Sequence, residues 1–291
     1  VLAALCSGSN HQPLNISDCS GKVDGFCRII AAMTQDRNFD DLAERFQRKV
    51  YGGLKGDIRL AVLWRDLEQY LPQIHGAEPL TVLDVGAGLG QLAIRLASLG
   101  HKVVVNDLSA EMLAVAQTAA RQAGVYEQIT WHHCPFQELA EQQSSQFDLV
   151  LCHAVVEWLA RPELLLPQLQ RFLAAEGRLS FTYYNRHSFE YRNLLRGNFN
   201  LLKRDRFVPD TGSLTPVNSL YPEQVRQWVD DADLVEVAAT GVRVFHDYVT
   251  NPRGGNAVAE AVIEMELAYS RRDPYRWLGR YIHLLLAHGG R

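Results

Sequence analysis

Glycines and acids in one stretch of the chain have the types and spacing of a nucleoside-binding site. An apolar run over 81–83 ends in Asp84, and a second run over 103–105 leads to Asp107. Three glycines at alternate positions follow the first acid: Gly86, Gly88 and Gly90. A turn without β-carbons lets the backbone lie against a ligand, and Asp107 can accept hydrogen bonds from both ribose hydroxyls. The chemistry predicted here is therefore the binding of a nucleoside.

The glycine spacing separates two classes of ligand. A dinucleotide site has its third glycine three positions after the second, where pyrophosphate rests on a helix N-terminus. Here Gln91 takes that position and Gly90 comes one residue early. The pattern D-x-G-x-G-x-G resembles instead the first motif of S-adenosylmethionine (SAM)-dependent methyltransferases, which implies SAM as the cofactor.

Further side chains at the ends of predicted strands complete a SAM site. Leu108 directly follows the ribose acid and is expected to cover one adenine face. Phe136 and Gln137 follow the third strand, where a ring and an amide can hold adenine, and His153 follows the fourth. The carboxyl ends of parallel strands meet at one edge of a sheet, so these residues should gather there. Taken alone, Phe136 would be a core residue, and His153 would be equally well explained as an ordinary strand-end histidine.

Strands and helices alternate through the part of the chain that carries these residues. We expect strands over 80–84, 102–106, 128–133, 147–152 and 177–184, separated by helices over 90–99, 109–123 and 162–174. Later we expect helices over 222–232 and 256–269 and strands over 234–246 and 280–288. Ser109 is a predicted N-cap. The alternation predicts a Rossmann-like α/β fold with a mostly parallel seven-stranded sheet flanked by helices.

Three segments organise the rest of the chain. Residues 1–32 are rich in Ser, Asn and Gly without a clear period, and we expect a disordered N-terminal extension. A single domain is expected over 33–291, beginning with N-terminal helices. Residues 186–220 are basic and aromatic without a long apolar period, and they predict a lid insertion.

Composition limits the function classes. The chain has 291 residues, 47% of them hydrophobic, and a net charge of -4, so any nucleic-acid surface must be a local patch. No apolar run approaches the ~18 residues of a membrane span. The five cysteines have neither an even count nor metal-ligand spacing. We therefore expect a cytoplasmic protein with no disulfide framework and no metal site.

The residues after the fourth strand restrict the methyl acceptor. The tetrapeptide CHAV over 152–155 lacks the N-P-P-Y-like element of amino-group methyltransferases and the proline–cysteine nucleophile of pyrimidine C5 enzymes. No lysine base for a ribose hydroxyl lies near a strand end. A carboxylate is already ionised at neutral pH and needs mainly positioning and a clamp. Candidate clamp residues come from two segments: Arg243, His246, Tyr183, Tyr184 and Asn185.

From Met33 onward the chain resembles the bacterial tRNA 5-carboxymethoxyuridine methyltransferase family. The matching stretches include QDRNFDDLAERF, VLDVGAGLGQLAI, HAVVEWLARP and TGVRVFHDY. That family makes the methyl ester of a modified uridine at the anticodon wobble position. The resemblance implies that Arg59 pairs with the methionine carboxylate of SAM. It also implies cofactor contacts at positions that the turn and strand ends already indicated: Gly86, Ala87, Asp107, Phe136, Gln137 and His153.

The charge pattern favours an anticodon stem-loop as partner. Six basic and two acidic residues lie between Arg186 and Arg206, a local charge of +4, and three aromatic residues interleave with them to offer stacking surfaces. A second basic cluster lies near the C-terminus: Arg271, Arg272, Arg276 and Arg280. The alternative interpretation is a solvated lid with ordinary surface charges.

Two other functions stay open at this point. One is a SAM-dependent methyltransferase for a small-molecule acid or a quinone-type acceptor. The other is a catalytically silent protein that binds SAM or RNA. The first predicts activity without tRNA, and the second predicts cofactor affinity without turnover.

Overall fold

The computed structural model describes residues 36–40, 52–142, 145–203, 216 and 218–290. The predicted extension over 1–32 and most of the first N-terminal helical pattern lie outside these residues.

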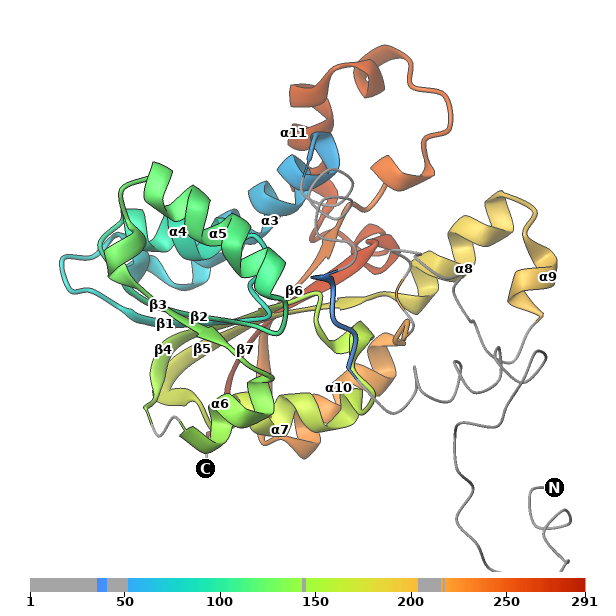
Figure 1. Cartoon of the computed structure of the whole chain (residues 1–291). Helices are drawn as coiled ribbons and strands as arrows, with labels where there is room; N and C mark the ends of the chain where they lie inside the picture. The colour runs from blue at the N-terminus through green and yellow to red at the C-terminus, as the bar shows by residue number, and fades with distance from the viewer. Residues whose placement is uncertain (1–35, 41–51, 143–144, 204–215, 217, 291) are drawn as a thin grey trace, which may run out of the picture.

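Seven strands form one sheet in the order β3-β2-β1-β4-β5-β7-β6 (Figure 1). They are β1 (Thr81–Val85), β2 (Lys102–Asp107), β3 (Ile129–His133), β4 (Phe147–His153), β5 (Leu173–Tyr184), β6 (Leu234–Val242) and β7 (Tyr281–His288). The pairs among β1 to β5 are parallel, and β7 runs antiparallel between β5 and β6. The predicted mostly parallel, seven-stranded sheet is therefore confirmed. Its strand order reverses between β1 and β4, where open α/β sheets bind ligands.

Helices cover both faces of this sheet (Figure 1). One face carries α3 (Leu54–Tyr70), α4 (Gln91–Ser98) and α5 (Ala110–Gln122), and the other carries α6 (Phe136–Gln142), α7 (Leu165–Gln170) and α10 (Pro222–Asp231). The other α-helices in the described residues are α8 (Arg186–Leu195), α9 (Phe199–Leu202) and α11 (Ala259–Tyr269). Short 3₁₀ helices are η5 (Pro72–His75), η6 (Tyr126–Gln128), η7 (Val156–Trp158), η8 (Pro162–Leu164), η9 (His246–Tyr248), η10 (Gly254–Ala257) and η11 (Tyr275–Leu278). In the described residues no helix combines the length and the apolar character needed to cross a bilayer.

Each face of the sheet has its own hydrophobic core. Leu67 of α3 and Leu96 of α4 pack with Leu151 on one face. Leu139 of α6 and Leu166 of α7 pack on the other. Burying one such side chain contributes about 1.5–3 kcal/mol. The two cores hold the strands rigidly, so the strand ends are fixed platforms for functional side chains.

The predicted helix over 162–174 is too long. Helix α7 ends at Gln170, and β5 already begins at Leu173. Gly177 suggested a helix end in the sequence, but it lies inside β5, where a β-carbon would meet the carbonyl oxygen of Phe147 at 2.8 Å. The β4–β5 register shifts at this place. Gly177 is thus required by a close backbone approach in the sheet.

The predicted lid begins as two helices, α8 and α9, which extend away from the sheet (Figure 1). Ser109 and Asn185 act as N-caps: Ser109 Oγ accepts from the N–H of Met112, and Asn185 Oδ1 accepts from the N–H of His187 at 3.1 Å. The predicted N-cap at Ser109 is confirmed, whereas residues 204–215 and 217 of the lid lie outside the description.

Candidate active site

The glycine turn connects β1 to α4 in a left-handed backbone conformation. Gly86, Gly88 and Gly90 have φ values of 64°, 58° and 65°. The N–H of Ala87 donates to the carbonyl of Asn106 at 3.1 Å, which ties the turn to the end of β2. Gly90 caps α4, and a β-carbon there would meet Ala116 at 3.2 Å. Gly90 therefore serves helix packing and lies outside the lining of the pockets described below, unlike the other two glycines.

Asp107 joins the turn to the start of α5. Its carboxylate accepts hydrogen bonds from the N–H of Gly88 at 2.7 Å and of Ser109 at 2.8 Å. Burial raises the pKa of Asp107, while the backbone hydrogen bonds from Ser109, Gly88 and Leu108 oppose the shift. Each carboxylate oxygen has a second acceptor site, and the residue lines the main pocket.

The main pocket lies at the carboxyl ends of β1, β2 and β4 and holds about 730 Å³ of space, part of it continuous with solvent. Most of the predicted cofactor residues line it: Gly86, Gly88, Asp107, Leu108, Phe136, Gln137 and His153. Leu108 and Phe136 contribute apolar surface to the lining, and Asp107 contributes an acceptor. The structure thus brings the predicted nucleoside-binding residues together.

Residues 36–40 cover this pocket, which the sequence reasoning missed. The Asp36 carboxylate accepts from Gln137 Nε2 and from the N–H of Ala160, both at 2.9 Å. The Phe39 ring meets Trp158 edge-on at 4.9 Å. Because Gln137 donates its amide to Asp36, its Oε1 is left buried without a hydrogen-bond partner in the described part of the chain. That free acceptor suits the exocyclic amine of adenine.

A second, smaller pocket shares Gly86 and His153 with the first. Arg59 brings a positive charge to its lining, and Asp84 brings a carboxyl group. Burial raises the pKa of Asp84 to about 8, the charge of Asp107 adds to this, and Arg59 opposes it. A ligand that fills both pockets would have a nucleoside at one end and a zwitterion at the other. SAM has this form, so the residues present fit it.

Four cations surround one buried carboxylate near the end of β6. Asp247 lies 3.5 Å from Arg243 Nη2, 3.7 Å from Arg280 Nε and 3.8 Å from Lys55 Nζ. Burial by itself would raise the pKa of Asp247, but the charges of Arg243, Arg280, Lys55 and Arg192 hold it below its usual range. We call Lys55, Arg192, Arg243, Arg280 and Asp247 the cation cluster. Within the cation cluster, four positive side chains accompany one acid.

Tyr184 and His246 lie beside the cation cluster. The guanidinium of Arg280 lies 4.6 Å from the centre of the Tyr184 ring. The Tyr184 hydroxyl is buried without a hydrogen-bond partner among the described residues. His246 begins η9 directly before Asp247, and burial lowers its pKa. The structure therefore brings three predicted clamp residues together: Arg243, His246 and Tyr184.

Two other clamp predictions do not fit the structure. Asn185 is fully buried, and its amide donates to the carbonyls of Trp277 at 2.8 Å and Gly279 at 2.9 Å. Since its Oδ1 caps α8, no group of Asn185 is left for a substrate. Tyr183 belongs to the hydrophobic core on the opposite face of the sheet from α3. Successive strand residues alternate between faces, so only one of the two tyrosines can face the cluster.

Glu157, which the sequence gave no reason to select, lies between the two regions. It is fully buried, and neither carboxylate oxygen has a hydrogen-bond partner in the described chain. Burial raises its pKa to about 8, against the charge of Arg59 from the smaller pocket. Glu157 also interacts electrostatically with Tyr281, the residue after Arg280. Near neutral pH it is mainly protonated and adds little negative charge to the cation cluster.

The predicted C-terminal arginine cluster does not form one basic surface. Arg271 pairs with Asp66 at 2.6 Å, Arg276 pairs with Asp273 at 2.6 Å, and Arg280 faces Asp247. Spacing alone could not reveal these partners. Among the described residues, no three His, Cys, Asp or Glu side chains are placed to hold a metal ion, and Cys134 and Cys152 are free thiols.

Comparison with known proteins gives consistent results. A family model described as a methyltransferase domain matches residues 83–181. The chain is 42% identical over 250 residues to the tRNA 5-carboxymethoxyuridine methyltransferase of Escherichia coli strain K12, covering 86% of this chain and 95% of that protein. It is 30% identical over 198 residues to the ubiquinone biosynthesis O-methyltransferase of Sodalis glossinidius, covering 63% of this chain and 77% of that protein.

Solved structures share the fold. The magnesium protoporphyrin IX methyltransferase of Synechocystis PCC 6803, crystallised with bound S-adenosylhomocysteine (SAH), has a TM-score of 0.55 at 17% identity. The match covers 87% of this chain and 96% of that one. At this identity the likeness concerns the fold.

Proposed function

We propose that this chain, which belongs to the tRNA 5-carboxymethoxyuridine methyltransferase family, esterifies the carboxylate of 5-carboxymethoxyuridine at the wobble position of a tRNA anticodon. SAM is its methyl donor, and Asp107, Gln137, Arg59 and His153 are the side chains that would hold it. When bound, SAM supplies a methyl group on a cationic sulfur. A carboxylate oxygen would attack that methyl carbon, the sulfur would leave as the neutral thioether of SAH, and no proton would be transferred.

Buried donors without acceptors carry this proposal. Tyr184 Oη, Arg280 Nη1 and Arg192 Nε are all buried, and none has a hydrogen-bond partner in the described part of the chain. Leaving such groups unpaired costs about 1–3 kcal/mol each, and more for charged ones. An anion with several acceptor sites would satisfy them. A carboxylate has four such sites and the planar geometry that arginine matches.

The electrostatics of the cation cluster favour the same ligand. Lys55, Arg192, Arg243 and Arg280 all act on Asp247, so one further carboxylate would bring the charge of the cation cluster closer to balance. Arg243 and Arg280 would orient the acceptor, and Tyr184 would donate its hydroxyl to it. Because the acceptor is already ionised, the site needs no general base. The protein's contribution is then positioning, with water kept out of a buried place.

The lid supports a nucleic-acid partner. Helix α8 contributes Arg192 to the cation cluster and exposes Leu194 and Leu195. Phe199 at the start of α9 is 55% exposed, and Arg196 and Lys203 flank it in sequence. Exposed rings and cations together suit splayed anticodon bases, which stack on aromatic side chains. We therefore assign tRNA contact to α8 and α9, and a tRNA substrate places the reaction in the cytoplasm.

Mass spectrometry of tRNA nucleosides tests the proposal. Purified protein is incubated with SAM and with tRNA that carries 5-carboxymethoxyuridine or unmodified uridine. One added methyl on the carboxymethoxy nucleoside alone is expected. Methylation of a small acid or a quinone precursor without tRNA would favour the acceptor class suggested by the Sodalis relative. Cofactor binding without transfer to any acceptor would indicate a silent binding protein.

A further inference from the structure

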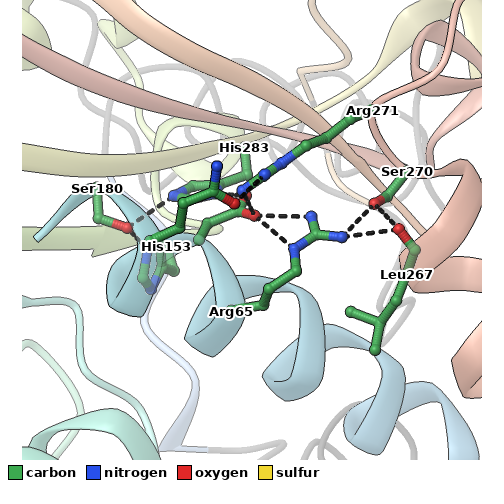
Figure 2. Close-up of polar contacts among 9 residues, drawn as sticks. Arg65, His153, Ser180, Leu267, Ser270, Arg271 and His283 are labelled. Atoms are coloured by element: carbon green, nitrogen blue, oxygen red, sulfur yellow. Dashed lines mark hydrogen bonds and ion pairs between the residues drawn. The ribbon is translucent and has the colours of Figure 1, made fainter. Parts of the chain in front are cut away.

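A line of buried polar side chains runs from α3 along one face of the sheet to His153 (Figure 2). Asp66 Oδ2 lies 2.8 Å from His283 Nδ1. His283 Nε2 lies 2.8 Å from Ser180 Oγ, which in turn lies 2.8 Å from His153 Nε2. Asp66, Ser180 and His283 are each at most 1% exposed. This chain of three hydrogen bonds thus ends at His153, whose ring lines both pockets.

The sheet register brings these side chains onto one face. His153 of β4 and His283 of β7 are both paired with Thr182 of β5. Ser180 precedes Thr182 by two residues and so points to the same face. Helix α3 packs against this face through Leu63 and Leu67, which puts Asp66 within reach of His283.

The far end of the line is an ionised carboxylate. Asp66 Oδ1 accepts from Arg65 at 2.7 and 3.0 Å and from Arg271 at 2.6 Å. Burial by itself would raise the pKa of Asp66, but the hydrogen bonds from His283 and Arg65 and the charge of Arg65 hold it well below its usual range. An ionised carboxylate only accepts hydrogen bonds, so His283 Nδ1 must carry a hydrogen.

Charge then sets the direction of the remaining hydrogen bonds. Arg65 and Arg271 already bring two positive charges to Asp66, so we assign His283 a single ring hydrogen, the one on Nδ1. Its Nε2 then accepts, and Ser180 donates its hydroxyl hydrogen to it. The Ser180 oxygen then accepts from His153 Nε2–H.

This direction decides what His153 offers to a ligand. Burial lowers the pKa of His153 well below its ordinary value, so the ring is neutral and carries a single N–H. That N–H points to Ser180, which leaves Nδ1 as a bare acceptor. Nδ1 of this ring makes no hydrogen bond with the described residues, and the ring lies in the same pocket as Arg59.

We propose that Asp66, His283 and Ser180 are positioning residues that hold His153 in the Nε2–H form, so that Nδ1 accepts a hydrogen bond from the methionine ammonium of the cofactor. The inference rests on the placement of the methionine end of SAM between Arg59 and His153. It explains why the middle of a hydrophobic sheet contains a serine and a histidine. A ring with hydrogen on Nδ1 would present a donor to the ammonium and repel it.

Nuclear magnetic resonance on the wild-type protein tests the tautomer directly. With ¹⁵N-labelled histidine, two-bond correlations distinguish a protonated ring nitrogen from a bare one, and a His153→Gln variant assigns the signal. We expect His153 with hydrogen on Nε2 and none on Nδ1, and we expect Ser180→Ala to give a mixture of both forms. Hydrogen on Nδ1 in the wild type would overturn the proposal, whatever the variants do.

Ligand binding tests the contact to the ammonium. SAH carries the methionine ammonium, whereas methylthioadenosine has the same nucleoside and sulfur without it. Ser180→Ala should weaken SAH binding by about tenfold, the factor for one net hydrogen bond, and leave methylthioadenosine binding unchanged in calorimetry. Equal losses for both ligands, or no loss for SAH, would contradict the inference.

Thr240→Val is the matched control. Thr240 lies on β6, is paired with His283, and is fully buried. Its hydroxyl has no hydrogen-bond partner among the described residues. The valine variant should bind both ligands as the wild type does. None of these measurements uses tRNA or turnover, so they stand apart from the test of the acceptor.

Discussion

Asp107, the last residue of β2, accepts a 2.7 Å hydrogen bond from the N–H of Gly88 in the turn that follows β1. The acid expected to bind ribose therefore also shapes the glycine turn beside it. Two parts of the cofactor site that lie nineteen positions apart are thus held by one carboxylate.

Asp107→Ala should weaken SAM binding by roughly 1.5–3 kcal/mol, because a charged hydrogen-bond acceptor is lost. Isothermal calorimetry with SAM measures this change. Asp148→Ala is the control, since Asp148 also accepts two hydrogen bonds, from Thr81 N and Oγ1, at the opposite end of the sheet. It should lower stability and spare SAM binding. Equal SAM affinities in wild type and Asp107→Ala would remove the ribose role.

Gly86→Ala should damage both stability and SAM binding. The φ of Gly86 is +64°, and a β-carbon there would clash with Val155 Cγ2, in the wall of the main pocket. Gly124→Ala separates the backbone strain from the steric clash. The φ of Gly124 is +73°, but no atom lies within 4 Å of the β-carbon that alanine would add. Both variants should lose about 1–2 kcal/mol in denaturant unfolding for the left-handed backbone, while only Gly86→Ala should lose SAM affinity. Normal SAM binding by Gly86→Ala would show that this wall can shift freely.

Arg243→Ala should lower kcat/KM for modified tRNA by about 10- to 100-fold, since a charge-assisted hydrogen bond contributes about 1.5–3 kcal/mol. SAM affinity should not change, because Arg243 lies in the cation cluster, apart from the residues that line the cofactor pockets. Arg276→Ala is a matched control, since Arg276 is satisfied by Asp273. Kinetics on tRNA with and without the carboxymethoxy group measures the effect. An equal loss in Arg276→Ala would point to general charge attraction for RNA.

Glu157→Gln should change how stability depends on pH. The pKa of Glu157 is 4.5 in its ordinary state and about 8 in the fold. Between these values the folded protein binds the extra proton, so wild-type stability falls as pH rises through this window. Glutamine carries no such proton. The free energy of unfolding of the variant should therefore rise relative to that of the wild type from pH 5 to 8, by on the order of 3 kcal/mol at pH 7.

Thermal denaturation across this pH range measures the gain. Glu163→Gln serves as the control, because the pKa of exposed Glu163 is lowered by its own backbone hydrogen bond and by Arg161. A lowered pKa affects stability only at acid pH, so this variant should show a constant offset from pH 6 to 8. Parallel curves for Glu157→Gln and wild type would mean that Glu157 is ionised in the fold.

The sequence predicted the parts of the site that depend on short segments. The turn at Gly86 and Gly88 and the acid at Asp107 have local chemistry that only a few structures share. Arg59 came from resemblance alone, since an arginine on an exposed helix turn has the same pattern as one in a pocket. The helix over 162–174 was wrong because Gly177 resembles a helix stop as much as a strand contact.

Residues joined by long-range packing could not be predicted. Arg280 and His283 reach the site only because β7 inserts antiparallel between β5 and β6. Asp36 covers the pocket through bonds to Gln137 and Ala160, more than a hundred positions away. Nothing in the local pattern around Glu157 distinguishes a buried acid from an exposed one. These relationships belong to the topology of the whole chain.

The insertion of β7 also ties the proposed clamp to the integrity of the sheet. Tyr184 ends β5, Arg243 directly follows β6, and Arg280 directly precedes β7, which lies between those two strands. The clamp therefore exists only where these three strand ends meet. A substitution that loosens the β5–β7 or β6–β7 pairing should disturb the clamp, while the glycine turn and Asp107, on β1 and β2, keep their places.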